Sequence, residues 1–412
     1  MDNLTHTLAG VVSADLALWL FERVRPSRPP SRNFRTLALM TSALASNAPD
    51  IDFVYVGITG GKLGYLLHHR GHTHTLLGLL PLSALCVGLA VLIERMLGRR
   101  TSLRGAVGLF GFAVFGAFLH LCMDFSNNYG VHPFWPFDNR WFYGDTLFIV
   151  EPWLLLALAG GSMGALGRSM RVLIGVAMAA LLALGWRGDY MGPGLAGALT
   201  VYAFGWLWWA QRAAPAGRLL GTVGVCLSFL GCSLWGRYAA RSALAEALAA
   251  DTELSVAELV STPAPGNPFC WQVLAVQRSR TQYVVRQGLV ASWPALLEAR
   301  ECAWQSEGNT APLAPSALAV SSPRGYRVVW GPEFRAPIAE LVQTLSGDCR
   351  AAAFARFARV PFWIRKGDAT TLIGDFRYDR SPAVDFAELP LGGEAPCPRF
   401  EPPWTPPFDA SG

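Results

Sequence analysis

Charged side chains are scarce in this chain of 412 residues. Asp, Glu, Lys and Arg make up 15% of it, whereas a typical soluble domain carries about a quarter, and apolar residues make up 52%. No CxxC pair occurs, which argues against a zinc ribbon. No basic run with interleaved aromatic residues occurs either, so we expect no nucleic-acid partner. This composition favours a membrane protein over a soluble enzyme.

Histidine is absent after residue 132. Four aspartates, Asp2, Asp50, Asp52 and Asp124, lie among the earlier histidines in otherwise apolar stretches. Imidazole and carboxylate together are the ligands of Zn²⁺ and its first-row neighbours, and polar groups in apolar surroundings are costly unless they are paired or metal-bound. The pattern therefore predicts a metal site. The seven histidines are His6, His68, His69, His72, His74, His120 and His132.

Apolar segments of helical length fill the first 240 residues. A membrane-spanning helix needs about 20 residues, with a range of about 17–25. The segments predict an all-α, polytopic membrane bundle of about eight hydrophobic helices over residues 1–240. They lie near residues 4–21, 36–56, 75–93, 105–122, 147–167, 172–186, 194–210 and 219–236.

The sequence changes character after residue 240. Alternating stretches such as WQVLAVQ (271–277) and TQYVVRQGLV (281–290) predict strands. We expect residues 241–412 to form a smaller mixed, mostly β, domain that ends in a Pro-rich tail. This region contains four cysteines, an even number that suits disulfides in an oxidising compartment, although four unpaired buried thiols fit equally well. They are Cys270, Cys302, Cys349 and Cys397.

Arginine clusters alternate with loops that are poor in Lys and Arg. The clusters lie at residues 23–35, 94–104, 168–171 and 212–218. Under the positive-inside rule they face the cytoplasm. The N-terminus, every candidate metal ligand and residues 241–412 are then expected on the extracytoplasmic side.

Two motifs carry most of the candidate ligands. HLCMD places His120 and Asp124 four residues apart and so on one helical face, although a capping Asp beside a hydrogen-bonded His has the same spacing. HHRGHTHT places four histidines in seven residues just before an apolar helix, and a solvated His-rich loop is its alternative. Its Arg70 suits an anionic substrate group such as phosphate, because guanidinium binds oxyanions in a bidentate manner.

The remaining candidates are weaker when each is taken alone. Asp50 and Asp52 of PDID could ligate or bridge metals, but Asx turns and helix caps favour the same pattern. A lone histidine such as His6 is more often structural. Together the motifs are stronger, because the predicted topology brings them to one membrane face.

Five ordered motifs resemble the YdjM-type family of LexA-regulated proteins of the bacterial inner membrane. They are MDNLTHTLAG, NAPDIDF, HHRGHTHT, HLCMDFSNNYGVHPFWPFDNRWFYGD and FIVEPW. The resemblance covers residues 1–155 well and implies a metal-dependent hydrolase activity. Glu151 stands where the family pattern has Asp, and other residues are usual at His72 and His132. The resemblance implies metal-ligand roles for His6, Asp50, Asp52, His69, His74, His120 and Asp124. The order of ligands is also distantly similar to zinc-dependent phospholipase C and the single-strand zinc nucleases.

The expected function is hydrolysis by a metal-activated water at the extracytoplasmic membrane face. One to three Zn²⁺ or other divalent transition-metal ions would activate the water, and a phosphoester or lipid-linked substrate fits a site beside the bilayer. Asp50, Asp52 or Glu151 could act as general base, with Arg70 on the substrate. The alternative is an ion transporter or metal-responsive membrane protein. Such a protein should carry ionisable residues near the middle of several helices, whereas most of these segments have apolar centres.

Overall fold

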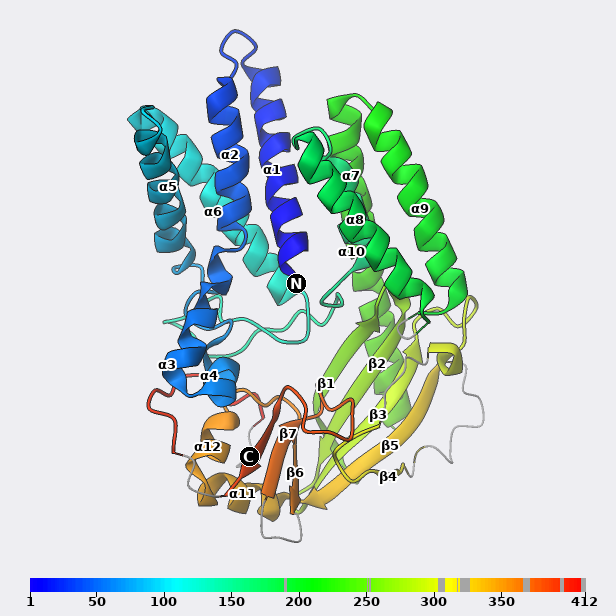
Figure 1. The fold of residues 1–412 in the computed structure, drawn as a ribbon. Helices are drawn as coiled ribbons and strands as arrows, with labels where there is room; N and C mark the ends of the chain where they lie inside the picture. Colours follow the sequence, from blue (N-terminus) through cyan, green and yellow to red (C-terminus); the bar gives the residue numbers. More distant parts are fainter. Residues whose placement is uncertain are drawn as a thin grey trace. The chain divides into compact units, whose positions relative to one another are not determined.

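The chain folds into two compact units, seen in a computed structural model (Figure 1). The structure describes residues 1–188, 191–249, 251, 253–302, 308–316, 318, 327–365, 371–392 and 396–408. The end of the predicted Pro-rich tail, residues 409–412, lies outside the described residues. The first unit comprises Met1–Ile51, His72–Trp135 and Leu147–Cys232, and the second comprises Asp52–Gly71, Pro136–Thr146 and Ser233–Gly412.

The first unit is helical, as the apolar segments predicted. Among the described residues, five helices, α1, α5, α6, α8 and α10, are long and apolar enough to cross a membrane. The predicted count of about eight spanning helices is not confirmed, because α2 has 14 residues and α7 has 11, fewer than a span of about 20 requires. The bounds are α1 Asn3–Val24, α2 Arg32–Ala45, α5 Leu79–Met96, α6 Leu103–Phe125, α7 Pro152–Ser162, α8 Arg168–Trp186, α9 Pro193–Arg212 and α10 Pro215–Leu248.

Small residues let α1, α2 and α6 approach closely. A Cβ on Gly10 of α1 would collide with Ser46 Oγ, and one on Gly116 of α6 would lie 2.7 Å from the carbonyl oxygen of Ser42. Ser42 Oγ donates a hydrogen bond to the carbonyl of Gly10 at 2.9 Å. Close backbone approach at glycine and serine is a usual way to pack membrane helices. It brings the end of α2 against the last turns of α6.

The second unit contains two antiparallel sheets, so the predicted mostly β character of the C-terminal region is confirmed. The larger sheet has the order β1-β2-β3-β5-β4 and the smaller one β6-β7-β8. The stretches WQVLAVQ and TQYVVRQGLV lie in β2 and β3. The strands are β1 Ser255–Ala264, β2 Asn267–Arg278, β3 Gln282–Ala291, β4 Ala314–Pro315, β5 Val328–Pro337, β6 Pro361–Arg365, β7 Thr371–Asp375 and β8 Glu388–Leu391. Its short helices are α3 Val56–Thr59, α4 Gly61–His68, α11 Ile338–Gly347 and α12 Cys349–Phe354.

Helix α10 contributes to both units, since the division falls between Cys232 and Ser233. In the second unit its last turns pack against the sheet, where Leu244 and Leu248 join a buried cluster with Trp271. Both faces of β2 are largely buried, so Val273 and Ala275 join this cluster and Leu274 and Val276 join a second one that contains Tyr283.

Two early segments of the chain are part of the second unit. Asp145 forms a bidentate ion pair with Arg359, with N–O distances of 2.8 and 2.9 Å, and both residues are buried. The Arg359 guanidinium also lies 3.9 Å from the ring centroid of Tyr143. In α4, the carbonyl of Leu67 accepts a hydrogen bond from the indole of Trp404 in the tail. The second half of the longest motif, WPFDNRWFYGD, therefore belongs mainly to this unit.

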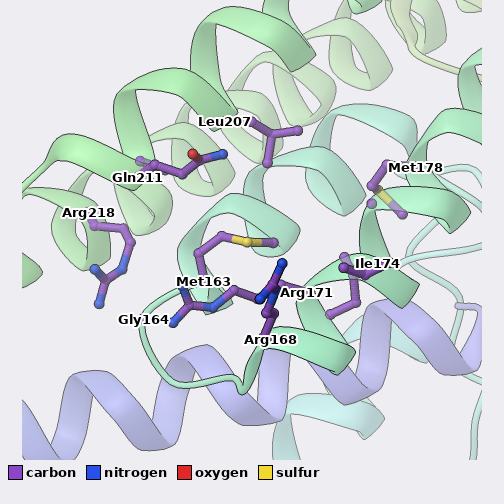
Figure 2. Close-up of a pocket in the computed structure, with 12 residues that line it drawn as sticks. Met163, Gly164, Arg168, Arg171, Ile174, Met178, Leu207, Gln211 and Arg218 are labelled. Carbon is purple, nitrogen blue, oxygen red and sulfur yellow. The ribbon is translucent and has the colours of Figure 1, made fainter.

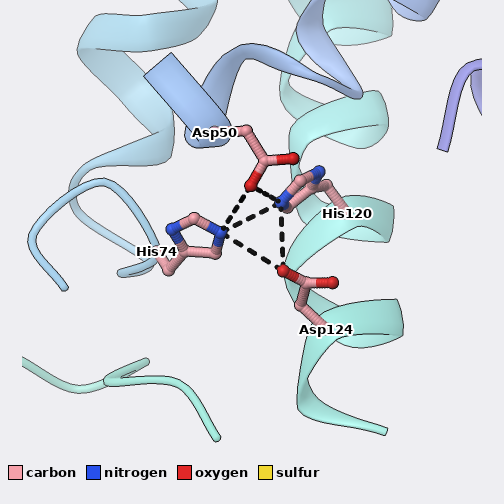
Figure 3. A group of neighbouring side chains, drawn as sticks. All are labelled: Asp50, His74, His120 and Asp124. Atoms are coloured by element: carbon pink, nitrogen blue, oxygen red, sulfur yellow. Dashed lines mark hydrogen bonds and ion pairs between the residues drawn. The ribbon is translucent and has the colours of Figure 1, made fainter. Parts of the chain in front are cut away.

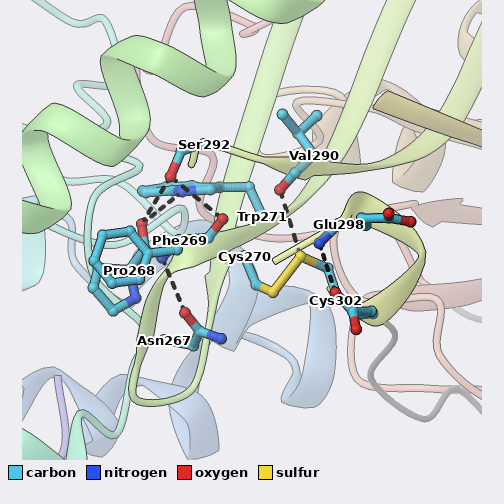
Figure 4. Close-up of a disulfide and its surroundings, with 10 residues drawn as sticks. Asn267, Pro268, Phe269, Cys270, Trp271, Val290, Ser292, Glu298 and Cys302 are labelled. Atoms are coloured by element: carbon cyan, nitrogen blue, oxygen red, sulfur yellow. Dashed lines mark hydrogen bonds between the residues drawn. A yellow bond between two sulfur atoms is a disulfide. The ribbon is translucent and has the colours of Figure 1, made fainter. Parts of the chain in front are cut away.

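Four cysteines of the second unit form two disulfides. Cys270 of β2 pairs with Cys302, and Cys349 of α12 pairs with Cys397 in the tail. Figure 4 shows the first disulfide beside Trp271 and Val290. Of the two alternatives that the sequence left open, the structure shows the disulfide one.

We expect Cys349→Ser to destabilise the oxidised protein. The disulfide joins residues 48 apart, and a crosslink of this length contributes about 2–4 kcal/mol by restricting the unfolded chain. Thermal unfolding with and without reductant measures the effect, and reductant should lower the melting temperature of the wild type more than that of the variant. Cys122→Ser, at an exposed free cysteine, is the control. Mass spectrometry of non-reduced peptides that finds Cys349 and Cys397 unlinked would contradict the pairing.

Candidate metal centre

Two histidines and two aspartates of the first unit converge on one point (Figure 3). His120 and Asp124 lie in the last turns of α6, and His74 lies in the turns that precede α5. Asp50 comes from the 3-10 helix η1 (Ala48–Tyr55), which follows α2. One ligand atom from each lies within 4.8 Å of the other three. The four residues Asp50, His74, His120 and Asp124 are called the metal cluster below.

Five of the six distances between ligand atoms of the metal cluster are close to those of tetrahedral coordination. The two imidazole Nε2 atoms are 3.0 Å apart. His74 Nε2 lies 3.5 Å from an oxygen of Asp50 and 3.3 Å from one of Asp124, and the corresponding distances from His120 Nε2 are 3.6 and 3.4 Å. Ligand atoms about 2.0–2.1 Å from a tetrahedral Zn²⁺ lie about 3.3–3.4 Å from one another. A single ion of this size fits between the four atoms.

Hydrogen bonds behind the imidazoles set their orientation. His120 Nδ1 donates to the carbonyl oxygen of Ser46 at 2.7 Å, so its proton is on Nδ1 and its Nε2 lone pair points into the cluster. His74 Nδ1 lies 3.0 Å from Thr73 Oγ1. Such second contacts are typical of metal-binding histidines, because they hold the ring in the ligating tautomer.

His6 extends the cluster through the second oxygen of Asp124. Oδ2 of Asp124 faces His74 and His120, whereas Oδ1 lies 3.2 Å from His6 Nε2 and contacts the amino group of Met1. The His6 and His120 rings are stacked, with centroids 3.9 Å apart. The structure thus brings His6, from the first turns of α1, to the same place as the α6 pair.

Burial and charge favour a cation in the cluster. His74, His120 and Asp124 are buried, and the side chain of Asp50 is 10% exposed. Burial raises the pKa of Asp50, but the hydrogen bond to His74 and the charges of His120 and His74 lower it, and the net result lies below the usual value. Two ionised carboxylates in such surroundings are costly without compensating positive charge. A divalent ion supplies it, and solvent reaches the cluster on the side of Asp50.

Asp52, His69 and Arg70 lie in the second unit. Asp52 accepts a hydrogen bond from His69 Nδ1 at 2.9 Å through one oxygen and from the backbone amide of Arg70 at 2.9 Å through the other. Arg70 is buried and has a φ of 59°, a left-handed conformation that non-glycine residues seldom adopt. The predicted metal-ligand roles of Asp52 and His69 stay predictions. The proposed binding of substrate phosphate by Arg70 stays a prediction.

The other candidates occupy different positions. Glu151 is the buried N-cap residue of α7 and is not one of the four residues of the cluster, and its role as general base stays a prediction. His132 is buried, and the ring of His72 meets that of Trp135 edge-on at 4.6 Å. His68 Nε2 lies 3.2 Å from the carbonyl oxygen of Phe400, and burial lowers its pKa. The four histidines of HHRGHTHT therefore divide among different surroundings.

Sequence reasoning missed the contacts made by backbone groups. The carbonyl of Ser46, which orients His120, and the amino group of Met1 carry no signal in side-chain identity. The small residues Gly10, Ser42 and Gly116, on facing helices, are the sequence signal for this close approach of α1, α2 and α6. The orientation of the His120 ring thus depends on how the helices pack, and this packing cannot be inferred from the spacing of residues along the chain.

The helices and the cluster define a class of protein, a helical membrane protein with a candidate metal centre. Residues 1–191 match the family model of the YdjM inner membrane protein. This match confirms the resemblance to that family seen in the five motifs. Comparison with curated proteins and with solved structures found no match.

We expect the purified protein to bind about one Zn²⁺, or a similar transition metal, per chain in the metal cluster. His120→Ala and Asp124→Ala should each lower Zn²⁺ affinity by at least tenfold, because each removes one of four converging ligands. Elemental analysis and zinc titration after chelation and dialysis measure this. His132→Ala, at another buried histidine, is the matched control and should bind zinc normally. Equal zinc binding by all four proteins would exclude the site.

Proposed function

We propose that this protein is a membrane-bound, metal-dependent hydrolase that acts on a phosphoester or lipid-linked substrate at the extracytoplasmic membrane face. The observation that carries the proposal is the near-tetrahedral spacing of the four ligand atoms of the metal cluster. The match of residues 1–191 to an inner-membrane family agrees with a site beside the bilayer.

The chain's own residues supply the remaining parts of a hydrolytic mechanism. A bound Zn²⁺ would supply a water with a pKa of about 7 and polarise the scissile group. His74 and His120 present Nε2, since Thr73 and Ser46 hold the far side of each ring. Asp50 is the partly exposed member, so substrate would enter on its side, and the carboxylate oxygen not turned to the cluster could accept the proton of the attacking water. Asp52 and Glu151 are alternative bases.

A cavity beside the cluster supports a lipid substrate. It has a volume of about 570 Å³, lies between α1, α6, α7 and α10, and is almost wholly apolar. Thr5 and Met123, which line it, are the chain neighbours of His6 and Asp124, and Leu16 and Leu20 line it farther along α1. An acyl or isoprenoid chain in this cavity would leave its phosphate close to the cluster.

The position of the cluster favours hydrolysis over ion transport. His120 and Asp124 lie in the last two turns of α6, and His6 lies in the first turn of α1. A transport path needs ionisable groups along the middle of several helices, whereas these groups gather at helix ends. A site at a helix end can be reached from the membrane surface.

The proposed orientation has a direct test. Arginine clusters alternate along the chain with loops that are poor in Lys and Arg, which by the positive-inside rule predicts an extracytoplasmic C-terminal region. The two disulfides of the second unit also suit an oxidising compartment. Alkaline phosphatase fused after Pro268 should therefore be active in cells. The matched fusion after Arg28, in the arginine-rich segment between α1 and α2, should be inactive. The reverse result would place the C-terminal region in the cytoplasm and the metal cluster with it.

Hydrolysis itself is tested with the zinc-loaded protein in detergent. Phosphodiester and phosphomonoester substrates with and without a lipid chain should be cleaved, and His120→Ala should lower the rate at least a hundredfold. Asp50→Asn should lower kcat more than it lowers zinc content, because the amide cannot accept a proton. His132→Ala is again the control. Zinc flux into proteoliposomes with no hydrolysis of any substrate would favour the transporter.

A further inference from the structure

A second cavity of the first unit combines arginine side chains with an apolar wall (Figure 2). Its volume is about 590 Å³, and it lies among the end of α7, the first half of α8, the end of α9 and the start of α10. The polar residues that line it are Arg168, Arg171, Gln211 and Arg218, and the larger apolar ones include Met163, Ile174, Met178 and Leu207. Met1 packs against Leu154 near the start of α7, so the metal cluster and this cavity lie towards opposite ends of that helix.

The arginines that line this cavity have little compensating negative charge. No acidic residue is among those that line it in the described part of the chain. Within that same part, the side chain of Arg168 has no hydrogen-bond or ion-pair partner, and Arg171 has only the carbonyl oxygen of Leu166, at 2.8 Å from its Nε. Two cationic side chains in the first turn of α8 also face the positive end of the helix dipole, which is unfavourable without an anion.

Arg218 is the buried cation of this cavity. It is 9% exposed, and its Nε donates to the carbonyl oxygen of Gly161 at 3.2 Å. Its Nη2 lies 3.7 Å from one oxygen of Asp15, whose other oxygen accepts a hydrogen bond from Arg35 at 2.9 Å. One carboxylate is thus shared by two arginines. A Cβ on Gly164 would collide with the Arg218 guanidinium, so glycine at 164 leaves the room that this side chain occupies.

The apolar part of the cavity favours a lipid over a free anion as the ligand. Ile174 and Met178 are buried along one face of α8, and Leu207 of α9 lies across from them. Val172 and Val176 on α8 are more than half exposed, which continues an apolar surface outwards along a helix that is long and apolar enough to span the membrane. Inorganic phosphate would use the guanidinium groups and leave this surface uncovered.

We propose that this cavity binds an anionic glycerophospholipid. The phosphate lies among Arg168, Arg171 and Arg218, where guanidinium groups donate charge-assisted hydrogen bonds, and an acyl chain covers Ile174, Met178 and the outer face of α8. Basic cavities between helices at the arginine-rich end of a membrane domain are suited to such headgroups. This inference does not depend on the proposed hydrolase activity.

The test compares two double variants of the full chain. Native mass spectrometry of the detergent-purified protein is used to titrate phosphatidylglycerol and phosphatidylcholine with matched acyl chains. Phosphatidylglycerol should bind the wild type at least tenfold more tightly than phosphatidylcholine. Arg168→Gln/Arg171→Gln should lose at least tenfold in affinity for phosphatidylglycerol, whereas Arg100→Gln/Arg104→Gln should lose less than twofold. The control pair removes the same charge from arginines that are exposed, as Arg168 and Arg171 are, and one of them also lies in the first turn of a helix.

Three outcomes would overturn the assignment. Equal losses in both double variants would show that the arginines act only through net charge. Equal binding of the two lipids would exclude selection of an anionic headgroup. Displacement of the lipid by millimolar glycerol phosphate or inorganic phosphate would identify a site for a free anion. Zinc content and melting temperature of each variant are measured in parallel, and Gln211→Ala, which keeps every charge, provides a second lining variant if the double variant unfolds.

Discussion

The electrostatic cost of burying Asp124 constrains the rest of the first unit. Its carboxylate lies at the end of an apolar helix, with two imidazoles at one oxygen and a third imidazole and the chain's amino group at the other. A buried carboxylate without such partners costs several kcal/mol. Because the partners come from α1, from the turns before α5 and from α6 itself, satisfying this one group requires these elements to meet.

Helix packing is what allows them to meet. Glycines on α1 and α6 bring both helices against the serines of α2, and this places the carbonyl of Ser46 where it fixes the ring of His120. Because of the same packing, the C-terminal end of α2 lies beside the cluster. The next element, η1, therefore begins there, and its Asp50 lies 3.6 Å from His120 Nε2. The metal cluster is therefore a consequence of close contact between helix ends, and its members need no loop of special shape.

The two halves of the longest family motif serve different purposes. Its first half supplies His120 and Asp124 of the metal cluster, whereas its second half supplies Tyr143 and Asp145, which surround Arg359 in the second unit. Asp145 has a positive φ of 48°, a conformation that its bidentate ion pair compensates. One continuous motif thus contributes residues both to a candidate functional site and to a structural ion pair.

The first unit also separates two kinds of polar chemistry along its helices. Histidines and aspartates gather where α1 begins and α6 ends, and arginines gather where α7 ends and α8 and α10 begin. Between them the helices present apolar surface, including that of the cavity between α1, α6, α7 and α10. This division agrees with a membrane domain whose two faces carry different ligands.

The sequence by itself determined the helical character of the first half, the strands of the second, and the position of His120 and Asp124 on one helical face. These follow from periodicity and composition, which are local properties of the chain. Only the tertiary structure decided that Asp50 and His74 meet His120 and Asp124, how Cys270, Cys302, Cys349 and Cys397 pair, and which described helices are long and apolar enough to span a membrane. The reason is that distances between residues far apart in the chain depend on how helices and strands pack, and spacing along the sequence carries no information about that packing.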